Sequence, residues 1–208
     1  MTQLFIAPGA CSFAAHVISH LLNADHGTAI EVVKVPIRTP DSPLWAVNPL
    51  GRVPALRLDD GQVLTENGAI LPYLGDLVPQ AGLSAPVGSL ERYRIQEWIG
   101  LLNSDVHNAF RPLGRPEFYN ADPATHDGIR SRGRERLAWL LDEIEKKLPQ
   151  EGWLFGARFT IADAYLGYYL RNVSRVGLPQ AQAPGISAYV GRYNAHPAVQ
   201  AALAAEAG

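Results

Sequence analysis

The sequence contains very little sulfur, with one cysteine and one methionine among 208 residues. A single cysteine, Cys11, excludes an internal disulfide, which is typical of a protein from a reducing compartment. No apolar run approaches the roughly 18 residues that a membrane span requires. The first residues carry no basic segment of the kind found in secretory signals. We therefore expect a cytoplasmic protein with no membrane partner.

The chain also lacks an excess of charge of either sign. Lys and Arg number 18 and Asp and Glu number 20, which gives a net charge of -2. Nucleic-acid binding through phosphates needs clustered excess Lys and Arg, so no nucleic-acid partner is expected. His16 and His20 lie one helical turn apart but have no obvious third ligand, and no metal site is predicted. The hydrophobic share of 47% excludes disorder.

The first third of the chain has the pattern of a small α/β unit. Apolar runs and Val-rich segments alternate with one stretch of helical spacing, which predicts a parallel strand pair joined by a right-handed crossover. An Asp-Asp-Gly turn between two apolar runs then predicts a hairpin. The expected elements are strand 4–7, helix 12–23, strand 30–35, hairpin strands 53–58 and 62–64, and helix 65–77.

Helical periodicity dominates the rest of the chain. The Pro- and Gly-rich stretch 79–88 is typical of a linker. Thr160 and Asp163 have capping-box spacing and are expected to serve folding, not catalysis. The predicted helices are 89–112, 126–148, 160–175, 184–195 and 197–206. The predicted organisation is an α/β domain over 1–78, the linker, and an all-helical domain over 89–208.

Cys11 lies where the first strand turns into the first helix. The free N–H groups and positive dipole of a helix N-terminus favour thiolate over thiol, so the pKa of Cys11 is expected below about 8.5. The alternative is a small buried apolar side chain, as most free cysteines are. Residue 14 is Ala, so no Cys-x-x-Cys pair exists. Any redox chemistry would need an external thiol.

Two further segments have the composition of a peptide-binding site. Pro54 follows Val53 at the start of a strand, and a cis bond there would leave the Val53 backbone free to pair with an extended peptide. The alternative is an ordinary trans strand start. The N–H groups of Glu66 and Asn67 could hold a carboxylate while the Glu66 side chain pairs with an ammonium. The alternative for this segment is simple N-capping.

These segments occur in a recognisable order. The matching stretches are 7–12 with His16, 47–56, 64–66, 97–98, His107 and 156–166. On these residues the sequence resembles the cytosolic glutathione transferase family, most closely its bacterial beta class. The resemblance implies a thioredoxin-like N-terminal domain and an all-helical C-terminal domain, in a homodimer that uses glutathione as a substrate.

The resemblance also implies a role for each site residue. Cys11 would lie beside the glutathione sulfur and form a mixed disulfide with it, and His107 would share in the thiol chemistry. Val53, preceding a cis Pro54, would bind the cysteinyl backbone of glutathione, and Glu66 and Asn67 its γ-glutamyl end. By position, Ser104 and His107 would come from the neighbouring subunit, on a shared helix face. The other expected glutathione contacts are Ala10 and Arg52.

The expected function is conjugation or exchange of the glutathione thiol with small electrophilic or hydrophobic substrates. Phe13, Phe110 and Leu113 are the candidates for a second-substrate pocket. Phe5 stands near the position where other classes use a tyrosine hydroxyl, which excludes that mechanism. The alternatives are a glutathione-dependent thiol–disulfide oxidoreductase, a carrier without catalysis, and a protein-interaction module on the same fold.

Overall fold

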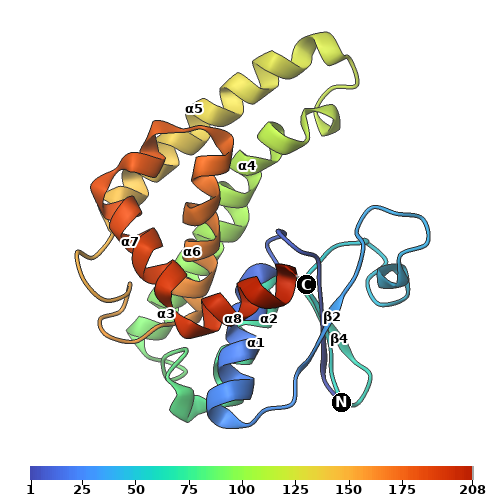
Figure 1. Ribbon diagram of the computed structural model, residues 1–208, viewed down its shortest axis with the longest axis vertical. Helices are drawn as coiled ribbons and strands as arrows, with labels where there is room; N and C mark the ends of the chain where they lie inside the picture. The colour runs from blue at the N-terminus through green and yellow to red at the C-terminus, as the bar shows by residue number, and fades with distance from the viewer. Residues whose placement is uncertain (208) are drawn as a thin grey trace.

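A computed structural model describes residues 1–207 of the chain (Figure 1). The strands are β1 (Gln3–Ile6), β2 (Glu31–Lys34), β3 (Ala55–Arg57) and β4 (Val63–Thr65). The helices are α1 (Phe13–His26), α2 (Asn67–Leu77), α3 (Leu90–Leu101), α4 (His107–Gly114), α5 (His126–Glu145), α6 (Ile161–Asn172), α7 (Pro184–Ala195) and α8 (Pro197–Ala207). None of these helices is both long and apolar enough to cross a membrane.

The strands form one mixed sheet in the order β2-β1-β3-β4. β1 and β2 are parallel, which confirms the predicted crossover, and β3 and β4 form the predicted antiparallel hairpin. α1 and α2 cover the face of the sheet that is turned toward the other helices, and the segment between β2 and β3 projects from the opposite side (Figure 1). The loops that leave β1, β2 and the turn before β3 therefore reach a common edge.

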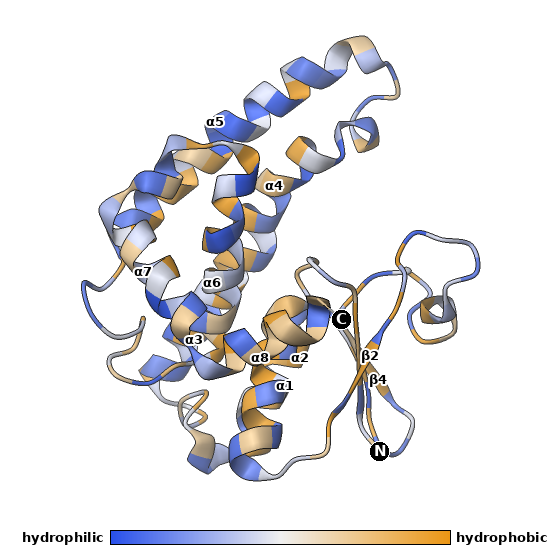
Figure 2. Ribbon diagram, in the orientation of Figure 1, coloured by the Kyte–Doolittle hydropathy of each residue, from blue (hydrophilic) through white to orange (hydrophobic). Residues whose placement is uncertain are grey.

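α1 joins the two halves of the molecule. More than half of its residues are buried, because it packs on α2 on one side and on α6 and α8 on the other. Its hydrophobic colouring in Figure 2 agrees with this burial on several sides. α1 ends at Gly27, whose left-handed backbone (φ 66°) lets its N–H bond the carbonyl of Leu22. One buried apolar cluster runs through both halves, and the domain boundaries at 78 and 89 remain predictions.

The predicted single helix over 89–112 is wrong. α3 and α4 are separated by a wider, π-helical turn over Leu102–Val106. Such a turn takes more residues than an α-helical turn and rotates the side chains that follow it, so spacing rules for an α-helix fail across it. The predicted helices over 126–148 and 160–175 are correct in position but end earlier in their α-helical form, at Glu145 and Asn172.

The capping box at the start of α6 is confirmed. The Thr160 backbone N–H and hydroxyl both donate to Asp163 Oδ2, at 2.8 and 2.6 Å. The other carboxylate oxygen, Oδ1, accepts from the Leu154 N–H at 2.8 Å and the Tyr189 hydroxyl at 2.5 Å. Asp163 is fully buried, so one carboxylate ties α6 to α7 and to the preceding loop. This supports the expected structural role.

Candidate active site

A cavity of about 760 Å³ opens between the loops of the α/β half and helices α4 and α6. It lies at the sheet edge where the loops after β1 and β2 and the turn before β3 meet. Nine of the residues expected at the site line this one cavity: Ala10, Cys11, Arg52, Val53, Pro54, Glu66, Asn67, His107 and Phe110. The structure thus brings together segments that are up to about 100 residues apart in sequence.

Cys11 lies in the turn just before α1, with its thiol 3.7 Å from the Val53 carbonyl oxygen. Burial, followed by the negative charge of Glu66, raises the pKa of Cys11 from 9.0 to about 11. The predicted fall of this pKa is therefore wrong. Backbone N–H groups of Cys11 and Ser12 do favour the thiolate, but loss of solvent and the nearby carboxylate outweigh them. Cys11 is therefore a neutral thiol at pH 7.

The bond between Val53 and Pro54 is cis, as the first of the two alternatives predicted. Gly51, two residues earlier, has φ +60°, and a Cβ there would lie 2.4 Å from the Trp45 ring. The Asn48 side-chain amide donates to the Arg52 carbonyl at 2.8 Å. These contacts fix the turn that presents Val53 to the cavity.

The junction of β4 and α2 is also fixed in an unusual conformation. Glu66 has φ +70°, which a side chain adopts only when its surroundings enforce it. The next residue, Asn67, is the first of α2, two residues later than predicted. Asn67 is buried and donates from Nδ2 to the Cys11 carbonyl at 3.0 Å. Asn67 therefore ties the Glu66 turn directly to the Cys11 turn.

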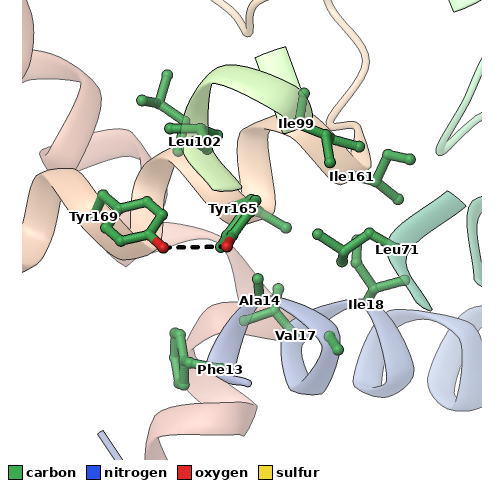
Figure 3. Close-up of a cluster of buried hydrophobic side chains, with 14 of the residues drawn as sticks. Phe13, Ala14, Val17, Ile18, Leu71, Ile99, Leu102, Ile161, Tyr165 and Tyr169 are labelled. Atoms are coloured by element: carbon green, nitrogen blue, oxygen red, sulfur yellow. Dashed lines mark hydrogen bonds between the residues drawn. The ribbon is translucent and has the colours of Figure 1, made fainter. Parts of the chain in front are cut away.

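His107 lines the cavity of its own chain, not that of a neighbouring subunit as the resemblance implied, and is held from behind by tyrosines of α6. The Tyr169 hydroxyl donates to the Tyr165 hydroxyl at 3.1 Å (Figure 3), which in turn donates to Asn103 Oδ1 at 3.0 Å. His107 Nδ1 lies 2.8 Å from the Tyr169 oxygen; with the single Tyr169 hydrogen given to Tyr165, the tautomer that has its proton on Nδ1 completes this series of hydrogen bonds. The Nε2 lone pair is then free to accept a proton.

The side chains in this series of hydrogen bonds, His107, Tyr169 and Tyr165, are uncharged at pH 7. Burial, and then the positive charge of Arg111, lowers the pKa of His107 below 6.5, so the imidazole is uncharged at pH 7. Burial also raises the pKa of both Tyr165 and Tyr169, which keeps them protonated as hydrogen-bond donors. Sequence reasoning missed the role of Tyr169, because tyrosines spaced four apart on a buried helix look like ordinary core residues.

Three of the expected site residues do not line this cavity; Ser104 was expected in the site of the neighbouring subunit, and that expectation stays a prediction. Ser104 faces a second groove, between α4 and α5, and its hydroxyl donates to the Gly100 carbonyl at 2.8 Å. Ser104 and His107 do not share a face, because the π-helical turn separates them. Phe13 belongs to the buried core on α1, beside Ala14 and Val17 (Figure 3), not to a substrate pocket.

Leu113 is likewise wrong as a pocket residue. It packs against α5, where a Cβ on Gly133 would lie 3.0 Å from its methyl group. The cavity is lined by Phe110, as expected, and also by Phe118 and three arginines, of which Arg111 and Arg115 follow Phe110 closely in sequence and Arg38 comes from the segment after β2. Within residues 1–207, no three His, Cys, Asp or Glu side chains are arranged to hold a metal ion.

The comparisons with known proteins agree with this arrangement. The profile of the glutathione S-transferase N-terminal domain matches residues 6–82, and that of the C-terminal domain matches residues 127–192. Over 205 residues the chain is 40% identical to glutathione S-transferase GstA of Escherichia coli O157:H7, with 98% of each chain covered. The chain belongs to the glutathione S-transferase family.

Solved structures place this glutathione S-transferase among bacterial relatives. It is similar to a beta-class glutathione S-transferase of Sphingomonas chungbukensis, with a TM-score of 0.85, 37% identity and 98% of each chain covered. It is also similar to a sphingomonad glutathione S-transferase solved in complex with glutathione, with a TM-score of 0.85 and 38% identity over 99% of this chain and 98% of that one. The predicted fold of a thioredoxin-like half followed by a helical half is confirmed.

Proposed function

We propose that this enzyme binds glutathione in the Cys11 cavity and transfers the glutathione thiol to small electrophiles. The observation that carries the proposal is the convergence of Cys11, Val53 beside a cis proline, Glu66 and His107 on one cavity. The cavity of about 760 Å³ has room for a tripeptide and a small second substrate. A similar structure was solved with glutathione bound, which supports this ligand.

Binding would rest on the backbone and on one carboxylate. An extended cysteinyl residue would pair with Val53 as an added strand, which matches a peptide but no particular side chain. The Glu66 carboxylate would pair with the glutathione ammonium, and the N–H groups at the start of α2 would hold the neighbouring carboxylate. Ala10 and Arg52 border the same part of the cavity. This arrangement would place the glutathione sulfur near Cys11.

The chemistry would rest on His107 more than on Cys11. His107 Nε2 would take the proton of the glutathione thiol, because the Tyr169 chain keeps the proton of the imidazole on Nδ1. The resulting thiolate attacks the electrophilic carbon, a carbon–sulfur bond forms, and the leaving group departs with the electron pair of its bond. The imidazolium then returns its proton to solvent. Cys11, a neutral thiol, can donate a hydrogen bond to the glutathione thiolate.

The rival reaction is thiol–disulfide exchange through Cys11. Its position on the cavity favours that reaction, and its raised pKa opposes it because exchange needs a thiolate. In that reaction the Cys11 thiolate attacks the glutathione sulfur of a mixed disulfide between glutathione and a substrate thiol, a Cys11–glutathione disulfide forms, and the substrate sulfur leaves as a thiolate. A glutathione thiolate then attacks the glutathione sulfur of the Cys11–glutathione disulfide, which releases the Cys11 thiolate and yields glutathione disulfide.

Steady-state kinetics with glutathione and 1-chloro-2,4-dinitrobenzene test the proposal. We expect His107→Gln to lower kcat by about 100-fold, the usual contribution of a general base. Cys11→Ala is expected to lower conjugation less than about tenfold and to abolish any exchange with a glutathione mixed disulfide. If the wild-type enzyme conjugates nothing but Cys11-dependent exchange is fast, the oxidoreductase is the correct function. Binding of glutathione by calorimetry without turnover in either assay would instead indicate a carrier.

We also propose that the enzyme is a homodimer, which rests on family resemblance and on the groove between α4 and α5. That groove holds Ser104 and an ion pair between Arg136 and Asp105 at 2.7 Å. Sedimentation equilibrium should give twice the mass of 22.6 kDa. A monomer at micromolar concentration would exclude a site completed by a neighbouring subunit.

A further inference from the structure

Three arginines whose charges act on one another give the cavity a positively charged end. Arg38, from the segment after β2, and Arg111 and Arg115, from the end of α4, all line it. Only Arg115 has an ionic partner, Glu117 at 3.1 Å. Within residues 1–207, neither Arg38 nor Arg111 has a carboxylate within ion-pair distance. Two of the three guanidinium groups therefore line the cavity without an ion-pair partner, in a protein whose net charge is -2.

The side chains of Arg111 and Arg115 and the backbone of Arg38 are held in place, although the three cations repel one another. The Arg111 and Arg115 guanidinium groups lie over the Phe118 ring, 5.5 and 5.9 Å from its centroid. Arg38 has φ +64°, and a non-glycine residue in that conformation is kept there by its surroundings. Burial, then the charge of Arg115 and, less strongly, that of Arg111 lower the pKa of Arg38 against the opposing charge of Glu117, so the three cations lie close enough to act on one another.

The same end of the cavity is aromatic. The Phe110 ring lies 5.5 Å from that of Tyr169, centroid to centroid, and both border the cavity together with Phe118. A flat apolar ring can therefore lie on these side chains while its anionic substituent meets the guanidinium groups. Arginine suits this purpose because its planar fork pairs with both oxygens of a carboxylate.

From this geometry we propose that Arg111, with Arg115 and Arg38, binds the carboxylate of an aromatic second substrate, so that the enzyme prefers anionic aromatic electrophiles. The inference rests on the proposed function and names its substrate class. Arg111 is the principal ligand, because Arg115 is already paired with Glu117. The carboxylate of glutathione itself is the other possible source of such a group, and the experiment separates the two.

The test compares the reaction of glutathione with a neutral aromatic electrophile and with an anionic one. 1-Chloro-2,4-dinitrobenzene and 4-chloro-3,5-dinitrobenzoate have the same leaving group, and their kcat/KM values are divided by their uncatalysed rates. At pH 8, with saturating glutathione, we expect the wild type to prefer the benzoate. Arg111→Gln should reduce that preference by at least about tenfold, the usual effect of losing a charged hydrogen bond. Arg134→Gln, an exposed arginine of α5 away from the cavity, is the matched control and should leave the preference unchanged.

Two outcomes would overturn the inference. One is an unchanged preference in Arg111→Gln. The other is a rise in KM for glutathione of the same size with both electrophiles, which would assign the arginines to the carboxylate of glutathione. Calorimetric titration with 3,5-dinitrobenzoate, which has no leaving group, tests the site even if neither electrophile is turned over. Binding to the wild type and not to Arg111→Gln supports the anion site, and no binding to the wild type contradicts it.

Discussion

The protonation state of Cys11 gives the sharpest prediction about the chemistry. A neutral disulfide such as 4,4′-dithiodipyridine reacts only with the thiolate, and Cys11 is the only cysteine, so the released pyridinethione reports that residue alone. A pKa of about 11 in place of 9.0 lowers the thiolate fraction at pH 7.5 about 100-fold. The more basic thiolate is the better nucleophile. With a Brønsted slope of about 0.4–0.5, each thiolate reacts roughly eightfold faster, which offsets part of the loss in thiolate fraction.

The net expectation is a reaction about tenfold slower at pH 7.5 than that of an unperturbed cysteine in a short peptide. The reaction rate should still rise tenfold for each pH unit up to pH 10, because the pKa of Cys11 lies above that range. Glu66→Gln removes the carboxylate that opposes the thiolate, so it should increase the rate at pH 7.5. A rate that levels off below pH 8.5 would contradict a raised pKa of Cys11 and would show that the helix N-terminus has the dominant influence on this pKa.

The remaining predictions concern the residues around the cavity and the fold that holds them. Because burial and Arg111 lower the pKa of His107, we expect kcat/KM for conjugation to stay constant down to pH 6.5 and to fall only below it; a fall already at pH 7.5 would contradict this. Tyr169→Phe leaves His107 Nδ1 without its partner, so kcat should decrease about tenfold with an unchanged KM for glutathione; an equal change in both would indicate a structural role. Asp163→Ala leaves four hydrogen-bond donors without an acceptor, so the free energy of unfolding measured with urea should decrease by about 4 kcal/mol. A decrease below about 1 kcal/mol would contradict the role of these hydrogen bonds. Gly51→Ala places a methyl group against the Trp45 ring, so KM for glutathione should rise, and an unchanged KM would show that the turn tolerates the displacement.

Much of the fold could be predicted because local signals and long-range packing agree. The strand–helix–strand unit, the Asp59-Asp60-Gly61 hairpin and the capping box at Thr160 each depend on residues that are close in sequence. The shared position of Cys11 and Val53 could be predicted from family resemblance. Their contact itself depends on β3 pairing with β1, which no local pattern specifies.

What could not be predicted depends on three-dimensional surroundings. The π-helical turn at Leu102–Val106 has no sequence signal that differs from an ordinary helix, and it changed the directions of Ser104 and His107. The pKa of Cys11 is set by burial and by a carboxylate 55 residues away in sequence. The grouping of Arg38 with Arg111 likewise joins the loop after β2 to the end of α4.

The proposed function requires that glutathione lies in this cavity with its sulfur against Cys11. A crystal structure of the enzyme grown with glutathione tests it most directly. We expect such a structure to show the cysteinyl backbone paired with Val53, the ammonium at Glu66, and His107 Nε2 within hydrogen-bond distance of the sulfur. Glutathione bound in the groove between α4 and α5, or a tripeptide whose sulfur points away from both Cys11 and His107, would contradict it.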